Sequence, residues 1–162
     1  MSGTHKDAGL TVKTVLLVED NDDDVFLIKR ACAAAGIPHT LLVIEDGQAA
    51  LDYLSGASES RKSVLPDLIL LDNRLPKVNG HEILKWLRSQ PTLKHLPAII
   101  LTGSILKCDL TLAYGAGATS YFYKQSSPAE LNLLLKTILE YWLQLNVILP
   151  SAFMPSAPSP TD

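Results

Sequence analysis

Four short apolar runs in this chain are each followed at once by polar residues that can take part in chemistry. The runs occupy residues 15–18, 68–71, 98–101 and 121–123, and the residues that follow them are Glu19 and Asp20, Asp72, Thr102, and Lys124. Such runs of Val, Ile, Leu and Tyr are typical of strands that are buried on both faces of a parallel sheet. The carboxyl ends of parallel strands form the edge where ligands bind. The polar side chains are therefore predicted to converge there as a phosphoryl and metal site.

Helical patterns alternate with the strand patterns along the chain. Predicted strands cover 14–19, 40–44, 66–72, 98–102 and 120–124, and predicted helices cover 22–35, 48–54, 81–89, 105–114 and 128–149. A loop is predicted at 55–63, where small and charged residues gather. The alternation predicts an α/β fold, with a doubly wound five-stranded parallel sheet and helices on both faces. One domain is expected over 14–149, between a flexible leader at 1–13 and a disordered Pro/Ser tail at 150–162.

Composition narrows the class of protein. Hydrophobic residues make up 47% of the 162 residues, which is enough for a buried core, and the net charge of -3 provides no basic surface for nucleic acid. No run reaches the roughly 18 uncharged apolar residues that a membrane span needs. Residues 1–13 lack the apolar core of a signal peptide. Cys32 and Cys108 have no metal-ligand spacing, so they are expected to be reduced thiols of a cytoplasmic protein.

Five acids stand within residues 19–24. Asp23 and Asp24 are assigned only to a solvated turn and to favourable charge at a helix start. Glu19 and Asp20 differ, because they end a buried strand beside the strand that ends at Asp72. Two carboxylates about 5 Å apart repel by about 3 kcal/mol at an effective dielectric constant of 20, so a cation is expected. An all-oxygen site favours Mg²⁺ or Mn²⁺ over zinc. An acidic turn would repel a pyrophosphate, which excludes a dinucleotide fold.

Four segments together resemble the receiver domain of two-component response regulators. They are VLLVEDN at 15–21, DNRLPKVNG at 72–80, LTGS at 101–104 and YFYK at 121–124, and the resemblance extends from residue 14 to about residue 141. It implies a flavodoxin-like sheet with strand order 2-1-3-4-5. The end of the last helix further resembles stand-alone receivers that partner bacterial and cyanobacterial phytochromes. The resemblance therefore implies a sensor histidine kinase, such as a bacteriophytochrome, as partner.

The resemblance also implies roles for individual residues. Asp72 would be the site of phosphorylation and would take a phosphoryl group from a phosphohistidine. Mg²⁺ would be bound directly by Asp20 and Asp72, through water by Glu19, and by the backbone carbonyl of Arg74. Lys124 would pair with Asp72 at rest and with the phosphoryl oxygens afterwards.

A second group of residues is assigned to switching. The hydroxyl of Thr102 would move beside the phosphoryl group, and Tyr121 would swing inward with it, although Tyr121 also suits a plain core position. Arg74 and Ser104 flank the site and would tune hydrolysis. The family usually has a cis-proline after its lysine, whereas this chain has Gln125, so the peptide is either trans or held cis with strain.

The last helix has apolar residues on more than one face, which predicts a homodimer through this helix and its neighbouring strand and helix. Three functions are weighed. The first is a stand-alone receiver in a phosphorelay, which catalyses only its own phosphorylation and dephosphorylation. The second is a phosphorylation-independent binding module, although Asp72, Asp20 and Lys124 are all present. The third is a Mg²⁺-dependent aspartyl-nucleophile phosphatase, although Arg74 stands where such enzymes carry a second acid.

Overall fold

The computed structural model describes residues 11–60 and 64–149. The predicted tail at 150–162 lies outside these residues, as does the predicted leader up to residue 10. The strand that follows begins at Lys13, the last residue of the predicted leader.

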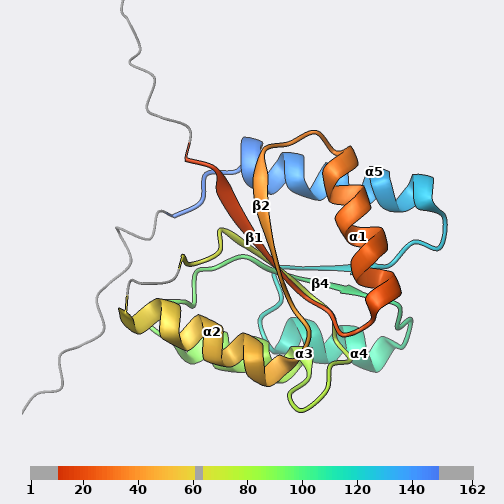
Figure 1. Ribbon diagram of the computed structural model, residues 1–162. Coiled ribbons are helices and arrows are strands. Elements are labelled where there is room, and N and C mark those ends of the chain that lie inside the picture. The colour runs from red at the N-terminus through yellow and green to blue at the C-terminus, as the bar shows by residue number, and fades with distance from the viewer. Residues whose placement is uncertain (1–10, 61–63, 150–162) are drawn as a thin grey trace, which may run out of the picture.

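Five parallel strands form one sheet in the order β2-β1-β3-β4-β5, as predicted (Figure 1). Their bounds are β1 Lys13–Val18, β2 His39–Ile44, β3 Leu68–Leu71, β4 Ala98–Thr102 and β5 Ser120–Tyr123. The register pairs Val18 with Leu71, and Leu71 with Ile100. The carboxyl ends of β1, β3 and β4 therefore lie at one edge of the sheet.

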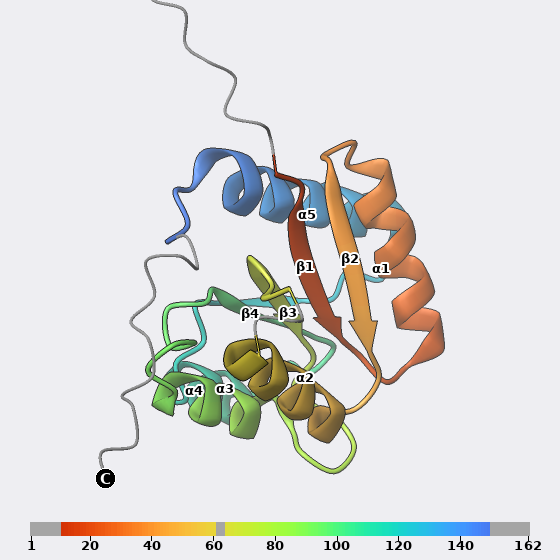
Figure 2. The ribbon, with the colours of Figure 1, turned by 60° about the vertical axis from the view of Figure 1, so that its left-hand side comes forward.

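Helices cover both faces of the sheet. Helices α1 (Asp22–Ala34) and α5 (Pro128–Leu139) lie on one face, and α2 (Gly47–Ser60), α3 (Gly80–Ser89) and α4 (Lys107–Gly115) lie on the other (Figures 1 and 2). Alternate residues of β1 serve the two layers: Leu17 packs in the cluster with α1 and α5, and Leu16 in the cluster with α2 and α3. This double burial explains the near-continuous apolar character of the strands.

Polar caps define where three helices begin. The side chain of Asn21 accepts a hydrogen bond from the backbone N–H of Asp24 at 2.9 Å. Asn79 and Glu82 form a capping box at the start of α3. Ser127 caps α5, whose first residue is Pro128. Each cap satisfies a backbone donor that the first helical turn leaves free.

Three helix predictions were wrong in their bounds by two residues or more, those for α2, α4 and the last helix. Helix α2 continues to Ser60, so the predicted loop does not exist at 55–60, and residues 61–63 lie outside the described chain. Small residues permit this extension because they pack closely: Ala57 is buried, and the Ser58 hydroxyl lies 2.6 Å from that of Thr92. The first helix past β4 begins at Lys107, two residues later than predicted.

The last helix is α-helical only to Leu139, not to residue 149. It continues as a π-helical segment, η1 (Glu140–Leu145), and ends at Asn146. The backbone N–H of Asn146 donates to the carbonyl of Tyr141, five residues earlier, at 2.7 Å. The wider turn places Leu143 in the core cluster of α1 and α5. Within 11–60 and 64–149, the helices are too short or too polar to cross a membrane.

Candidate functional site

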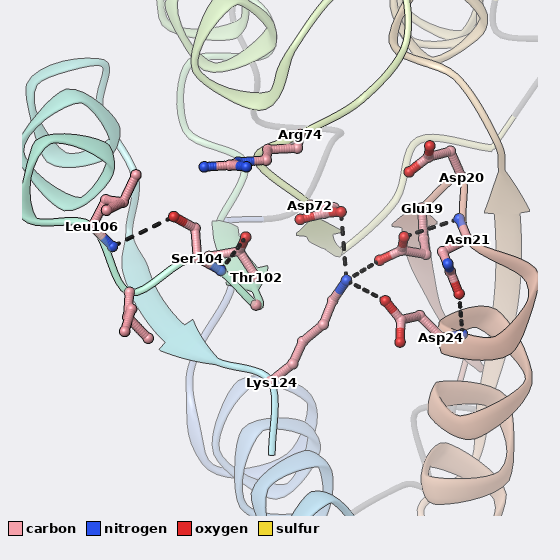
Figure 3. A pocket seen from close by; sticks show the side chains of 12 residues that line it. Glu19, Asp20, Asn21, Asp24, Asp72, Arg74, Thr102, Ser104, Leu106 and Lys124 are labelled. Atoms are coloured by element: carbon pink, nitrogen blue, oxygen red, sulfur yellow. Dashed lines mark hydrogen bonds and ion pairs between the residues drawn. The ribbon is translucent and has the colours of Figure 1, made fainter. Parts of the chain in front are cut away.

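A pocket of about 550 Å³ opens at the carboxyl edge of the sheet (Figure 3). The predicted site residues that line it come from the ends of four strands and from the loop after β3. They are Glu19, Asp20, Asp72, Arg74, Thr102, Ser104 and Lys124. The structure thus brings into one pocket residues that lie up to 105 positions apart in the chain.

Three carboxylates lie close together in this pocket. One oxygen each of Glu19, Asp20 and Asp72 lies within 4.8 Å of the others, with Glu19 and Asp72 buried and Asp20 exposed. Backbone donors orient two of them: the N–H of Asn21 donates to Glu19 at 3.1 Å, and that of Asn73 donates to Asp72 at 2.7 Å. This all-oxygen donor set, with one exposed member, fits a Mg²⁺ or Mn²⁺ ion that keeps several waters.

The loop after Asp72 is packed tightly against the start of α3. A Cβ atom on Gly80 would lie 2.5 Å from the carbonyl oxygen of Asp72 and 2.9 Å from the Cα of Asn73. The N–H of Gly80 donates to the carbonyl of Asn73 at 2.9 Å. Glycine is therefore required here, because any side chain would displace the backbone that carries Asp72.

Lys124 extends from the end of β5 into the acidic cluster. Its Nζ lies 2.6 Å from Glu19 Oε2, 2.8 Å from Asp24 Oδ2 and 3.4 Å from Asp72 Oδ2. Burial alone would lower the pKa of Lys124. The hydrogen bonds to Asp24 and Glu19 and the charge of Asp72 outweigh burial and raise this pKa above its ordinary value. The ammonium is therefore a permanent positive charge in the pocket.

Glu19 is the most deeply buried of the acids, with 1% of its surface exposed. Burial raises the pKa of Glu19 above its ordinary value, the contact with Lys124 opposes that rise, and the charge of Asp72 adds to it. The Lys124 ammonium is thus the cation that balances Glu19 and Asp72 in this arrangement.

Thr102 and its neighbours connect the pocket to α4. The buried Thr102 hydroxyl oxygen accepts a hydrogen bond from the N–H of Ser104 at 3.3 Å. The Ser104 hydroxyl donates to Asp109 on α4, and Arg74 lies 3.7 Å from the same carboxylate. Tyr121 does not line the pocket; its hydroxyl donates to the Ser104 carbonyl at 3.3 Å, which links β5 to the loop after Thr102.

Two acids were missed or misjudged from the sequence. Asp24 was assigned only to helix-start charge, yet it also forms an ion pair with Lys124. Its position in the first turn after a strand end, near the predicted site, was the available signal. Asp109 had no signal, because the contact with Ser104 depends on how α4 packs. The peptide bond between Lys124 and Gln125 is trans, which resolves the alternative left open by the missing proline.

Known proteins are similar to this chain in sequence. The model of the response regulator receiver domain matches residues 15–136. Probable methanogenesis regulatory protein FilR2 of Methanothrix harundinacea is 41% identical over 132 residues, covering 82% of this chain and 84% of that protein. Response regulator Rcp1 of Synechocystis sp. is 35% identical over 140 residues, covering 86% of this chain and 95% of that protein.

Two solved structures extend the likeness to three dimensions. The phosphorylated cyanobacterial phytochrome response regulator RcpA superposes with a TM-score of 0.80 at 36% identity, covering 86% of this chain and all of that one. The Mn²⁺-bound form of Rcp1 superposes with a TM-score of 0.77 at 33% identity, covering 85% and 99%. The chain therefore belongs to the response regulator receiver family, whose members are signalling proteins and not conventional enzymes.

Proposed function

We propose that this receiver accepts a phosphoryl group on Asp72 from a phosphohistidine of a sensor histidine kinase. A carboxylate oxygen of Asp72 attacks phosphorus, the P–N bond to the histidine breaks as the P–O bond forms, and the freed imidazole keeps the electron pair and takes up a proton. The observation that carries the proposal is the convergence of Asp72 with two further acids and one ammonium. Phosphoryl transfer depends mainly on such positioning and charge neutralisation.

The acids would hold a divalent cation during this reaction. Asp20 and Asp72 would supply direct ligands, Glu19 would act through water, and the Arg74 carbonyl would complete the protein ligands. Bound Mg²⁺ or Mn²⁺ would neutralise charge on the phosphoryl oxygens. The spacing of the three carboxylates supports this assignment, as does the Mn²⁺-bound form of Rcp1.

After phosphorylation, Lys124 and Thr102 contact the phosphoryl oxygens, and Tyr121 responds to the movement of Thr102. The link runs through Ser104, which contacts Thr102 through its backbone N–H and Tyr121 through its carbonyl. A displacement of this loop must therefore alter the Tyr121 hydrogen bond, while Arg74 and Ser104 at the pocket rim would tune hydrolysis.

A phytochrome-type histidine kinase is the partner that the relatives favour, because RcpA is described as a cyanobacterial phytochrome response regulator. Both cysteines are free, which supports action in the cytoplasm. We also propose a homodimer through α5 and η1, together with β5 and the helix α4 that contacts β5. Exposed apolar side chains on these elements support it, including Tyr123, Leu133, Tyr141 and Leu145.

Beryllofluoride with Mg²⁺ tests the phosphoryl site, with backbone amide signals as the readout. In the wild type, shifts should spread from Thr102 to Tyr121 and α5. Asp72→Asn should abolish them, since it removes the attacking carboxylate, whereas the exposed control Asp52→Asn on α2 should respond as the wild type does. An unchanged response in Asp72→Asn would show that the acceptor is misassigned, and a silent wild type would favour a phosphorylation-independent binding module.

A further inference from the structure

Among the partners that Lys124 has in the described part of the chain, Asp24 is the one that comes from a helix. Its Oδ2 lies 2.8 Å from the ammonium, closer than Asp72 at 3.4 Å, and the contact spans 100 residues of sequence. Asp24 is not one of the three acids whose oxygens can share a cation. The carboxylate of Asp24 therefore acts on Lys124 and not on a cation held by the other three acids.

The position of Asp24 determines the side of the pocket toward which Lys124 is held. Figure 3 shows Lys124 rising between Asp24 on the α1 side and Thr102 on the opposite side, with Asp72 above its tip. An ammonium has three N–H donors, and three carboxylates surround it. A phosphoryl group on Asp72 adds acceptors on the Asp72 side. Two of the three donors are already bonded to Glu19 and Asp24, so a closer hold on several phosphoryl oxygens draws Lys124 away from one of these acids.

Asp24 is the contact best placed to be lost. A cation held by Glu19, Asp20 and Asp72 would already weaken the contacts of these acids with the ammonium, so Asp24 would be the main remaining contact that keeps Lys124 on the α1 side. Asp24 also lies at the pocket rim, with 35% of its side chain exposed, so water can solvate the carboxylate once the lysine leaves. Glu19 differs in both respects, because it belongs to the possible cation ligands and is buried away from water.

We propose that Asp24 is a positioning residue that holds Lys124 toward α1 in the unphosphorylated site and releases it when Asp72 carries a phosphoryl group. The inference rests on the proposed function, because it assigns Asp24 a part in the same reaction. Asp24 thereby opposes activation, and its removal makes the activated arrangement easier to reach.

The first arm of the test measures the lysine without any phosphoryl analogue. The side-chain NH₃⁺ signal of Lys124 is followed by NMR in the wild type, Asp24→Asn, Asp24→Glu and Asp23→Asn. Asp24→Asn should speed hydrogen exchange of this ammonium about fivefold, because one charge-assisted hydrogen bond is lost. Asp24→Glu should restore slow exchange, and Asp23→Asn, which removes the same charge from the adjacent exposed position, should leave it unchanged.

The second arm is a beryllofluoride titration at saturating Mg²⁺. Asp24→Asn should bind beryllofluoride about fivefold more tightly than the wild type, and Asp23→Asn less than about twofold more tightly. The effect of Asp24→Asn should disappear in a Lys124→Met background. An effect that persists there would identify simple repulsion between Asp24 and the anion, and would overturn the inference.

The outcomes separate the inference from the function on which it rests. A wild type that fails to respond to beryllofluoride contradicts the proposed function, whereas the exchange arm still reports whether Asp24 holds Lys124. A wild type that responds normally, with equal exchange and equal affinity in Asp24→Asn and Asp23→Asn, leaves the phosphoryl site intact and refutes the role of Asp24. Substitution at Asp24 keeps the helix start, because the capping bond uses only its backbone N–H.

Discussion

The pocket contains more negative than positive side chains, and Lys124 is the residue that makes this tolerable. The Lys124 side chain is only 14% exposed, and its ammonium contacts two buried acids, Glu19 and Asp72. A buried ion pair that loses one partner leaves an uncompensated charge, which costs more than the intact pair contributes. The state without a cation therefore depends on this lysine for stability as well as for chemistry.

Lys124→Met should lower the free energy of unfolding by about 3 kcal/mol at neutral pH in the presence of a chelator, because Glu19 and Asp72 then repel without a counter-charge. Urea denaturation followed by circular dichroism measures the loss. The exposed Lys29→Met on α1 is the control and should change stability by less than about 0.5 kcal/mol. Equal stability of Lys124→Met and wild type would show that Lys124 does not balance the acids.

The same variant should be sensitive to pH through Glu19. The folded protein already holds the pKa of Glu19 above its ordinary value of 4.5, and losing the Lys124 hydrogen bond raises that pKa further. A raised folded-state pKa means that stability is fully present below the unfolded value and is lost as pH rises through the folded value. The gap between wild type and variant should therefore be small near about pH 4 and largest near about pH 7.

At the scale of elements, the loop after β3 is held against the start of α2. The N–H of Gly47 faces the Pro76 carbonyl at 3.4 Å, and Lys77, which adopts a φ of 67°, forms an ion pair with Asp46 at 3.2 Å. A Cβ on Gly47 would lie 1.8 Å from the carbonyl oxygen of Val78. Helix α2 thus supports the loop that continues from Asp72, the proposed phosphoryl acceptor.

Gly47→Ala should lower the free energy of unfolding by about 2 kcal/mol, because the clash is with backbone and the loop has to move. Gly56→Ala in the same helix is the control: an added Cβ meets no atom of residues 11–60 and 64–149 within 4 Å, and alanine favours a helix interior, so stability should rise by up to about 1 kcal/mol. Thermal or urea unfolding of both variants measures these changes in the free energy of unfolding. A Gly47→Ala protein as stable as wild type would contradict the tight packing.

The helices and strands also show how much of the fold can be predicted from the sequence. Strands were predicted to within one or two residues, because burial on both faces leaves an apolar run with polar ends. Helix α2 was cut short at Leu54, since Ser55 to Ser60 resemble a loop unless the neighbouring Thr92 is known. The π-helical turn of η1 was not predictable, because a short change from α-helical to π-helical hydrogen bonding leaves no pattern in sequence.

At the scale of the whole molecule, exposed apolar side chains recur along α5 and η1 and at the end of β5. Leu145 is 70% exposed, and Tyr123, Leu133 and Tyr141 are exposed on β5, α5 and η1. Exposed apolar groups that recur on adjoining elements are typical of an interface. The receiver core was predictable from the chain alone, whereas this surface depends on the shortened helix, which only the structure revealed.

Leu145→Asp should convert the proposed dimer into a monomer, because a charge would be buried at the interface. Analytical ultracentrifugation at tens of micromolar, with and without beryllofluoride, measures the change. Val64→Asp places the same charge at an exposed apolar position outside the proposed surface and should remain dimeric. A wild type that sediments as a monomer under both conditions would refute the dimer.

The two sides of the pocket belong to different layers of the molecule. Asp24 and Lys124 adjoin α1 and α5, which pack on one face of the sheet, whereas Ser104 binds Asp109 of α4 on the other face. A phosphoryl group on Asp72 would therefore meet one layer through Lys124, whose Nζ lies 3.4 Å from Asp72, and the other through Arg74, which lines the same pocket and pairs with Asp109. A conformational change would then not have to pass through the sheet from one layer of helices to the other. Binding partners on the two sides of the molecule would respond to the same phosphorylation independently.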